Sequence, residues 1–236
     1  MPSYGPIIGL AQFTGADNSA FSAYVADVGL GQGTNPDGGD PAAFRLFDNK
    51  LKRPDNVSAG VGYAHFQGDL THDHFRLESD MELRQLYTAG AQNHGALTFR
   101  GNDQLDVDRE YVKVVAVSDA VDTVHIYWQR VLGNAQPEGA TLATNLTISL
   151  AAFRLCIEVE GALVTVLRQP YGGGADVAVG DFTLATPYND ASHRRFGVDF
   201  LYVNTSGGGI VGNKWDNYRV LGPNEPPPAP ARVLVR

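Results

Sequence analysis

The sequence predicts an all-β protein, an antiparallel sandwich of two β-sheets. Apolar and polar residues alternate with period two in many short segments. These segments are rich in β-branched and aromatic residues and are separated by Gly, Asn and Asp. No segment keeps a helical period over three turns, and the one candidate, residues 18–29, is short and ends in glycines. Many short strands between turn signals favour a two-sheet sandwich.

The clearest strand is FRLESDMEL, residues 75–83. Its apolar side chains share one face, which we expect to lie in the core: Phe75, Leu77, Met81 and Leu83. Residues 153–169 predict two strands joined by a tight turn at residues 160–162. The other expected strands are residues 95–101, 109–117, 122–132, 194–204 and 214–222.

The chain length of 236 residues suits one large β domain, and its 43% of apolar residues suffice for a sizeable core. We expect a single sandwich over residues 1–222. Within it, residues 1–70 form loop-rich first strands, including one with a turn at Asp48-Asn49. Prolines cluster in residues 223–236, which predicts an extended, polyproline-like tail.

Charge and cysteine content exclude several classes of partner. The formal net charge is −8 and no lysine- or arginine-rich block is present, which argues against nucleic acid as a partner. Cys156 is the single cysteine, so no intrachain disulfide can form, and we expect it to be a buried, inert thiol. No apolar run is long enough to cross a bilayer and the start does not resemble a signal peptide, so no membrane insertion is expected.

Four motifs occur in an order that resembles concanavalin A-like (laminin-G-like) jelly-roll domains. The resemblance covers roughly residues 12 to 222. It lies in FTGADNSAFSAY, in FRLESDMEL followed by HGALTFRGND, in FRLCIEVEGALVTVLRQ, and in FGVDFLYVNTSG followed later by KWDNYRVLG. The early Phe-x-x-Ala-Asp opening also resembles minor tail proteins of phages that infect actinobacteria.

This resemblance implies a non-enzymatic structural component of a phage virion, either a minor tail protein or a capsid-surface (decoration) protein. Its expected location is the virion, and its expected partners are other virion proteins and further copies of itself. Contact with a cell-surface glycan is an additional expectation. Because this fold hosts many functions, a carbohydrate-binding module and a glycoside hydrolase stay open as alternatives.

The hydrolase alternative rests on a Glu-x-Asp-x-Glu run, which resembles the catalytic strand of retaining β-glucanases of the lichenase and laminarinase type. Alternation puts Glu78, Asp80 and Glu82 on one face of the strand. In this reading Glu78 is the nucleophile, Asp80 the tuning partner and Glu82 the acid/base. The two glutamates are about 13 Å apart at Cα, and leaning side chains would have to narrow the gap toward the ~5 Å of a retaining mechanism.

Two arginines argue for a different role. Arg76 and Arg84 share that face and bracket the three carboxylates. Nearby cations favour ionised carboxylates, whereas a general acid needs a raised pKa. We therefore expect a solvated or cross-strand-paired face of the sandwich rather than a catalytic one.

Glycan binding would require exposed aromatic side chains. The candidates are Tyr127, Trp128 and Tyr171, while Trp215 falls in the closing motif and is expected to pack in the core. The Gly-Gly-Gly run at residues 172–174 does not lead from a strand into a helix, so it fails the context of a phosphate-binding loop.

No cofactor or metal is expected. His72 and His74 share a strand face, but no third zinc ligand has a matching spacing. Calcium stays open as an alternative through three oxygen-rich loops, with no ligands assigned: residues 15–18, 35–40 and 101–108.

The C-terminal tail is the candidate for partner contact. It combines a proline run with an apolar end that fits an exchanged strand or a groove in a neighbouring subunit. The candidate contact residues are Pro226, Pro227, Pro228, Val233, Leu234 and Val235.

Overall fold

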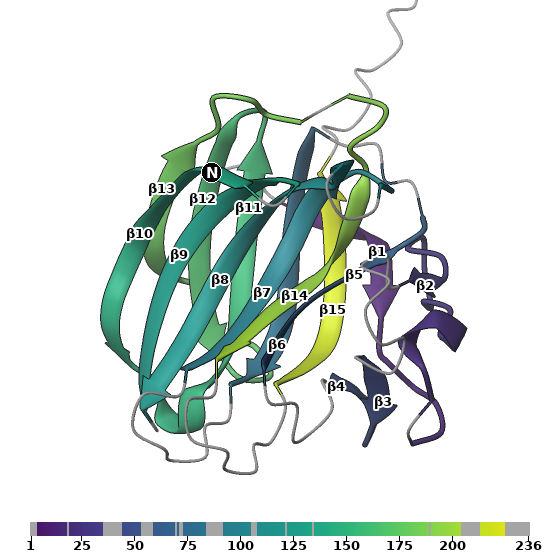
Figure 1. Ribbon diagram of the computed structural model, residues 1–236, viewed down its shortest axis with the longest axis horizontal. Helices are drawn as coiled ribbons and strands as arrows, with labels where there is room; N and C mark the ends of the chain where they lie inside the picture. The colour runs from purple at the N-terminus through teal and green to yellow at the C-terminus, as the bar shows by residue number, and fades with distance from the viewer. Residues whose placement is uncertain are drawn as a thin grey trace, which may run out of the picture.

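Two antiparallel β-sheets pack face to face in the computed structural model of the chain (Figure 1). The described residues contain short 3-10 turns but no α-helix, so the predicted fold class is confirmed. The structure describes residues 4–17, 19–34, 44–52, 59–68, 70, 73–83, 92–104, 108–120, 122–133, 135–188, 190–203 and 213–224.

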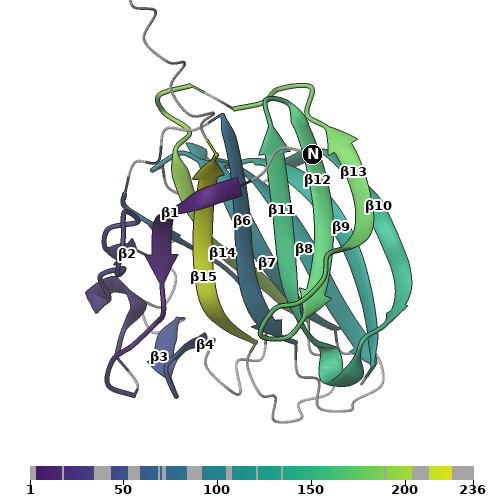
Figure 2. The ribbon, with the colours of Figure 1, turned by 180° about the vertical axis from the view of Figure 1, so that it is seen from behind.

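One sheet, called here the β6 sheet, contains the FRLESDMEL strand near its middle (Figure 2). Strand β1 (Tyr4–Ala11) joins this sheet by pairing with β15. The order of the other strands is β13 (Val177–Thr183), β12 (Leu163–Pro170), β11 (Ala152–Glu160), β6 (His74–Glu82), β15 (Lys214–Pro223), β4 (Lys50–Lys52) and β3 (Arg45–Phe47).

The other sheet, called here the β8 sheet, faces the viewer in Figure 1. Its order is β10 (Ala135–Thr147), β9 (Thr123–Leu132), β8 (Glu110–Ala120), β7 (Gln92–Gly101), β14 (Arg195–Val203), β5 (Ala59–Phe66) and β2 (Gly33–Thr34). The long strand β10 therefore lies at one end of the sheet, where its neighbour is β9.

The core lies between the two sheets and collects the inward row of every long strand. The expected inward residues of β6 are all buried: Phe75, Leu77, Met81 and Leu83. Phe75 meets Phe196 of β14 edge-on with the ring centroids 4.9 Å apart, which joins the two sheets. Trp215 is fully buried, so its expected packing role is confirmed.

The local turns follow the sequence signals. β11 and β12 form the predicted hairpin, in which Gly161 supplies the positive φ of the turn. Asp48 and Asn49 both have positive φ between β3 and β4, as a tight two-residue hairpin turn requires. The helical candidate at residues 18–29 contributes only the 3-10 turn η1 (Phe21–Ala23). A second 3-10 turn, η3 (Ser149–Ala151), precedes β11.

The remaining sequence expectations concern the chain end and membranes. Strand β15 continues through Pro223, and residues 225–236 lie outside the described residues, as do the tail contact candidates. Within the described part of the chain, no helix has the length and apolar character needed to cross a bilayer.

Candidate functional site

The polar row of β6 lies on the outer face of the β6 sheet, opposite the core. Its members Arg76, Glu78, Asp80 and Glu82 are 8%, 3%, 0% and 8% exposed. The expectation of a solvated or cross-strand-paired face is therefore confirmed in its second form: the row is paired across strands and is not solvated. A central strand receives charged neighbours from both sides, and here a loop also covers it. Arg84 lies outside the described residues.

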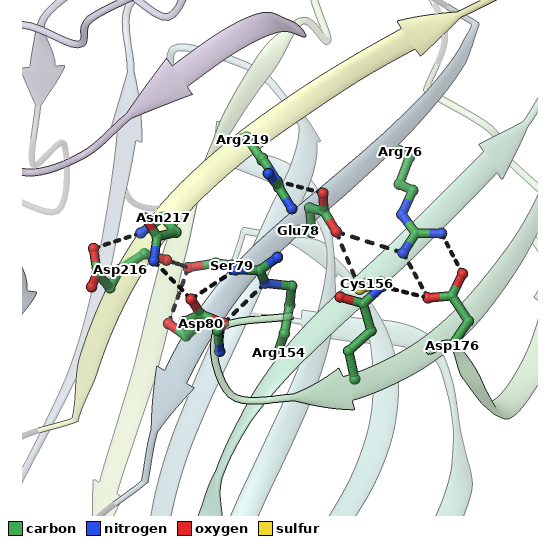
Figure 3. A network of polar contacts seen from close by, with 12 residues as sticks. Arg76, Glu78, Ser79, Asp80, Arg154, Cys156, Asp176, Asp216, Asn217 and Arg219 are labelled. Atoms are coloured by element: carbon green, nitrogen blue, oxygen red, sulfur yellow. Dashed lines mark hydrogen bonds and ion pairs between the residues drawn. The ribbon is translucent and has the colours of Figure 1, made fainter. Parts of the chain in front are cut away.

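Asp80 is held by two strands and a loop (Figure 3). Arg154 of β11 donates from Nε and from its NH2 group to the two carboxylate oxygens, each at 2.9 Å. Asn217 of β15 donates its amide to Oδ2 at 2.8 Å, and the backbone N–H of Gly172 donates to Oδ1 at 3.0 Å. Four donated hydrogen bonds satisfy the two oxygens of this buried carboxylate.

Glu78 lies between two arginines. Arg219 of β15 contacts it at 2.5 Å and Arg76 at 3.5 Å. The thiol of Cys156 lies 3.5 Å from Glu78 Oε2. Cys156 is buried as expected, and burial raises the pKa of its thiol far above the usual value, which favours the unreactive protonated form.

Glu82 is the third carboxylate of the row. Lys50 of β4 donates to Oε1 at 2.5 Å, and the hydroxyl of Tyr171 donates to the same oxygen at 3.1 Å. Lys214 of β15 adds a more distant contact at 3.8 Å. Burial alone would raise the pKa of Glu82, but the bond from Lys50 and the charges of the two lysines outweigh it, so this pKa is lowered.

The loop between β12 and β13, residues 171–176, covers this row. It makes the bonds from Tyr171 to Glu82 and from Gly172 to Asp80, and its Asp176 accepts two hydrogen bonds from Arg76, at 2.7 and 2.9 Å. Gly172 has φ +82° and Gly173 φ +110°, conformations that favour glycine. The glycine run that failed the phosphate-loop context thus forms the turn that brings the loop onto the carboxylates.

These contacts define what the row can do chemically. Each of the three carboxylates contacts at least one cation, and the pKa of Glu82, the acid/base of the hydrolase reading, is lowered rather than raised. A general acid needs the opposite shift. A fourth carboxyl, Asp216, pairs across the strands with Asp80, and burial raises its pKa.

The three aromatic candidates fall in different places. Trp128 is 7% exposed and stacks on Phe182 between the sheets, with centroids 4.1 Å apart, so its ring faces are covered. Tyr127 is half-buried on the outer face of the β8 sheet, where its hydroxyl lies 3.0 Å from His94 Nδ1. Tyr171 is 38% exposed beside Glu82. The structure therefore does not bring the three together.

Metal binding has no support among the described residues, where no group of three or more His, Cys, Asp and Glu is placed to hold an ion. Asp17 of the first oxygen-rich loop accepts the backbone N–H of Asp48 and so serves a turn. His72, Asp106 and the whole loop 35–40 lie outside the described residues.

Solved structures place this architecture among known folds. A pseudo β-1,3-glucanase of Mycobacterium tuberculosis is 15% identical, with 92% of this chain and 99% of that chain covered and a TM-score of 0.58. The CBM66 carbohydrate-binding module from Bacillus subtilis is 18% identical, covering 80% and 95%, with a TM-score of 0.51. The CBM2 module of the evolved Dit of Lactobacillus casei BL23 phage J-1 is 9% identical, covering 78% and 80%, with a TM-score of 0.51.

The fold is the concanavalin A-like jelly roll. At these identities the likeness concerns the fold alone, and the neighbours include both glucanase-like and carbohydrate-binding sandwiches. No protein-family model matches the sequence, and no curated protein matches it.

Proposed function

We propose that this chain is a non-enzymatic structural component of a phage virion, a minor tail or capsid-surface protein that uses a glucanase-like sandwich as a rigid building block. One observation carries the non-enzymatic part. The carboxylates that a retaining hydrolase would use are buried, paired with cations and covered by residues 171–176.

A sugar chain would need access to that face, and the covering loop opposes it. Moving the loop would break the bonds from Gly172 to Asp80 and from Tyr171 to Glu82. It would also separate Asp176 from Arg76 and leave a buried guanidinium short of two acceptors. Arg76 would keep Glu158 and Glu78 as partners, but the hydrogen bonds lost to Asp80, Glu82 and Arg76 together favour the covered state.

The virion setting is supported by two features. The phage Dit module has the same fold, which makes a jelly roll of this type suitable for a virion particle. The sequence adds a proline-rich segment with an apolar end, and such segments dock into grooves or sheet edges of neighbouring subunits. The proposed partners are accordingly other virion proteins and further copies of this chain.

Association with particles tests this role. Mass spectrometry of density-purified virions should detect the chain, and immunogold electron microscopy should place it on the tail or the head. Deletion of residues 225–236, which spares strand β15, should abolish particle association while the domain stays folded. A milder variant, Leu234→Asp, should weaken particle association. Absence from purified virions would overturn the role, and full association of both variants would overturn the tail contact.

Hydrolysis assays test the non-enzymatic part separately. Wild-type protein should release no reducing sugar from laminarin or lichenan. Turnover that is lost in Glu78→Gln would instead establish the retaining β-glucanase alternative, with Glu78 as the nucleophile.

A carbohydrate-binding module is the second candidate. Its supporting observations are the likeness to the CBM66 module and the exposed ring of Tyr171 beside polar groups. A glycan array that gives binding lost in Tyr171→Ala would favour it at that position.

A further inference from the structure

A polar depression is lined by residues of β9 and β10. These two strands lie on the side of the molecule far from β1 and β2 (Figure 1). The depression has a volume of about 280 Å³, close to the lower end of the roughly 300–1,000 Å³ typical of small-molecule sites. Its lining residues are Tyr127, Trp128, Gln129, Gln136, Glu138, Gly139, Ala140 and Thr141.

The depression forms where β10 pairs regularly with β9 between two irregularities. Glu138 through Thr141 pair in register with Arg130 through Tyr127, and the register shifts on either side of this stretch. Such shifts bend a strand and re-aim its side chains. Gly139 belongs to the lining, and a Cβ there would lie 2.7 Å from the Trp128 carbonyl oxygen, so the close pairing requires glycine and keeps a side chain out of the depression.

One wall is a fixed aromatic ring. Tyr127 packs against Val115 and its neighbours on the outer face of the β8 sheet, and its hydroxyl is held by His94 Nδ1 at 3.0 Å. Thr141 lies directly across the strand pair from Tyr127 and contributes an exposed hydroxyl group. A ring held in place beside hydroxyl groups contacts a sugar ring with little loss of side-chain entropy.

The opposite wall consists of two amides. Gln129 donates from Nε2 to Gln136 Oε1 at 2.6 Å, which fixes both amides and leaves the Gln136 nitrogen as a donor and the Gln129 oxygen as an acceptor. Glu138 is ion-paired with Arg130 at 2.8 Å and pairs with it in register, so its carboxylate lies on the Trp128 side of the strand pair rather than beside Tyr127 and Gln129. Arg130 is in turn anchored on the hydroxyl of Tyr188 at 3.0 Å.

The chemistry of these groups indicates which class of ligand fits the depression. On the side of Tyr127 the lining offers amide donors and acceptors, hydroxyl groups and an aromatic ring. An anion would find no cation on this side of the lining, and a metal ion would find no carboxylate there. We propose that the depression between β9 and β10 is a binding site for a neutral carbohydrate, with Gln129 and Gln136 bonding its hydroxyl groups and Tyr127 contacting its ring. This site goes beyond the virion role and is separate from the face of Glu78, Asp80 and Glu82.

Binding assays with matched variants test the site. The probes are a glycan array, then soluble β-1,3-glucan, mannan and a peptidoglycan digest, titrated into ¹⁵N-labelled protein and followed by NMR. Wild-type protein should bind at least one probe, with shift changes concentrated in residues 127–141. Gln129→Ala and Gln136→Ala should each weaken that binding at least tenfold. The control is Gln12→Ala, an exposed glutamine after β1, which should bind as wild type does.

Three results would overturn the proposal. They are absence of binding to every probe at millimolar concentration, shift changes centred on Tyr171 and Glu82, and wild-type affinity in both glutamine variants. Failure here is distinguishable from failure of the virion role, because Gln136→Ala should associate with particles as wild type does. Thermal unfolding of each variant separates loss of the site from loss of the fold, since both glutamines lie on the surface strands β9 and β10 and should leave Tm nearly unchanged.

Discussion

Arg154 and Asp80 form a two-point ion pair in which both partners are almost completely buried. Two parallel hydrogen bonds of 2.9 Å join the guanidinium to the carboxylate, and the two side chains are 6% and 0% exposed. Both charged groups of such a pair have lost their hydration, so each depends on the other for stabilisation. The polar face of the β6 sheet is therefore organised around complementary charges.

Removal of the cation should be costly. Arg154→Met keeps most of the side-chain volume but leaves the Asp80 charge buried with two fewer donors, so we expect the free energy of unfolding to fall by roughly 3–5 kcal/mol. Urea denaturation followed by circular dichroism measures this change.

Two further variants separate the ion pair from ordinary packing. Asp80→Asn combined with Arg154→Met removes the stranded charge and should recover part of the loss. Arg168→Met, at a half-buried arginine of the neighbouring strand β12, should change stability by less than about 1 kcal/mol. An equal loss in the Arg154 and Arg168 variants would contradict the role given to the pair.

Two buried histidines predict a stability change in mild acid. Burial and nearby cations lower the pKa of both His65 and His94 to about 4. Between the usual histidine pKa of about 6.5 and this value, the unfolded chain holds protons that the folded chain lacks. The free energy of unfolding should therefore fall as the pH drops through this window, by up to about 1.4 kcal/mol per pH unit for each histidine.

Urea titrations at pH 8, 6 and 5 measure this dependence. His94→Gln should flatten the slope by about half, whatever its effect on absolute stability. Tyr127→Phe is the matched control, because it removes the hydroxyl that contacts His94 Nδ1 without removing an imidazole. The lowered pKa values of Glu82 and Asp176 add a separate loss of stability only below about pH 4.3, near the usual carboxyl pKa. A flat profile between pH 6.5 and 5 would contradict the neutral state of the two histidines.

Asp176 is predicted to hold the loop 171–176 in its covering position. Asp176→Ala removes the two bonds that tie the loop to Arg76, which keeps Glu158 as an acceptor, so the amide of Gly172, which bonds Asp80, should exchange its hydrogen faster. The stability loss should be only about 1 kcal/mol, because the Asp176 side chain is 40% exposed. Asp181→Ala, an exposed carboxylate on β13, serves as the control. Unchanged exchange at Gly172 in the Asp176 variant would show that the loop is held elsewhere.

The strands that the sequence predicts are those with strong alternation and β-branched residues. The hairpin of β11 and β12 and the turn at Asp48-Asn49 need only local signals, and both form as expected. Strand β10 was missed because its residues, AQPEGATLATNLT, include Pro, Gly and several alanines. An end strand that is mostly exposed lacks the buried row that makes alternation visible.

The polar face shows why site geometry is harder to predict. Alternation correctly placed Glu78, Asp80 and Glu82 on one face, but their partners come from distant positions. Arg154 lies 74 residues from Asp80, and Asn217 lies 137 residues from it. Nothing in one sequence states that β6 lies between β11 and β15, so pairing and burial of the carboxylates required the strand order.

Trp128 gives a prediction that bears on how glycan binding should be tested. Its ring stacks on Phe182 with an interplanar angle of 4°, and it ties β9 to β13 of the opposite sheet. Trp128→Ala would open a cavity between the sheets and should lower the free energy of unfolding by roughly 3–5 kcal/mol. Trp128→Phe keeps a stacked ring and should lose less than half as much.

Loss of glycan binding in Trp128→Ala would therefore report unfolding rather than a missing contact. Tyr127→Ala, by contrast, changes the wall of the depression on the outer face. Denaturation curves of the three variants check this order, and a Trp128→Ala protein as stable as Tyr127→Ala would show that the stacked ring contributes little to holding the sheets together.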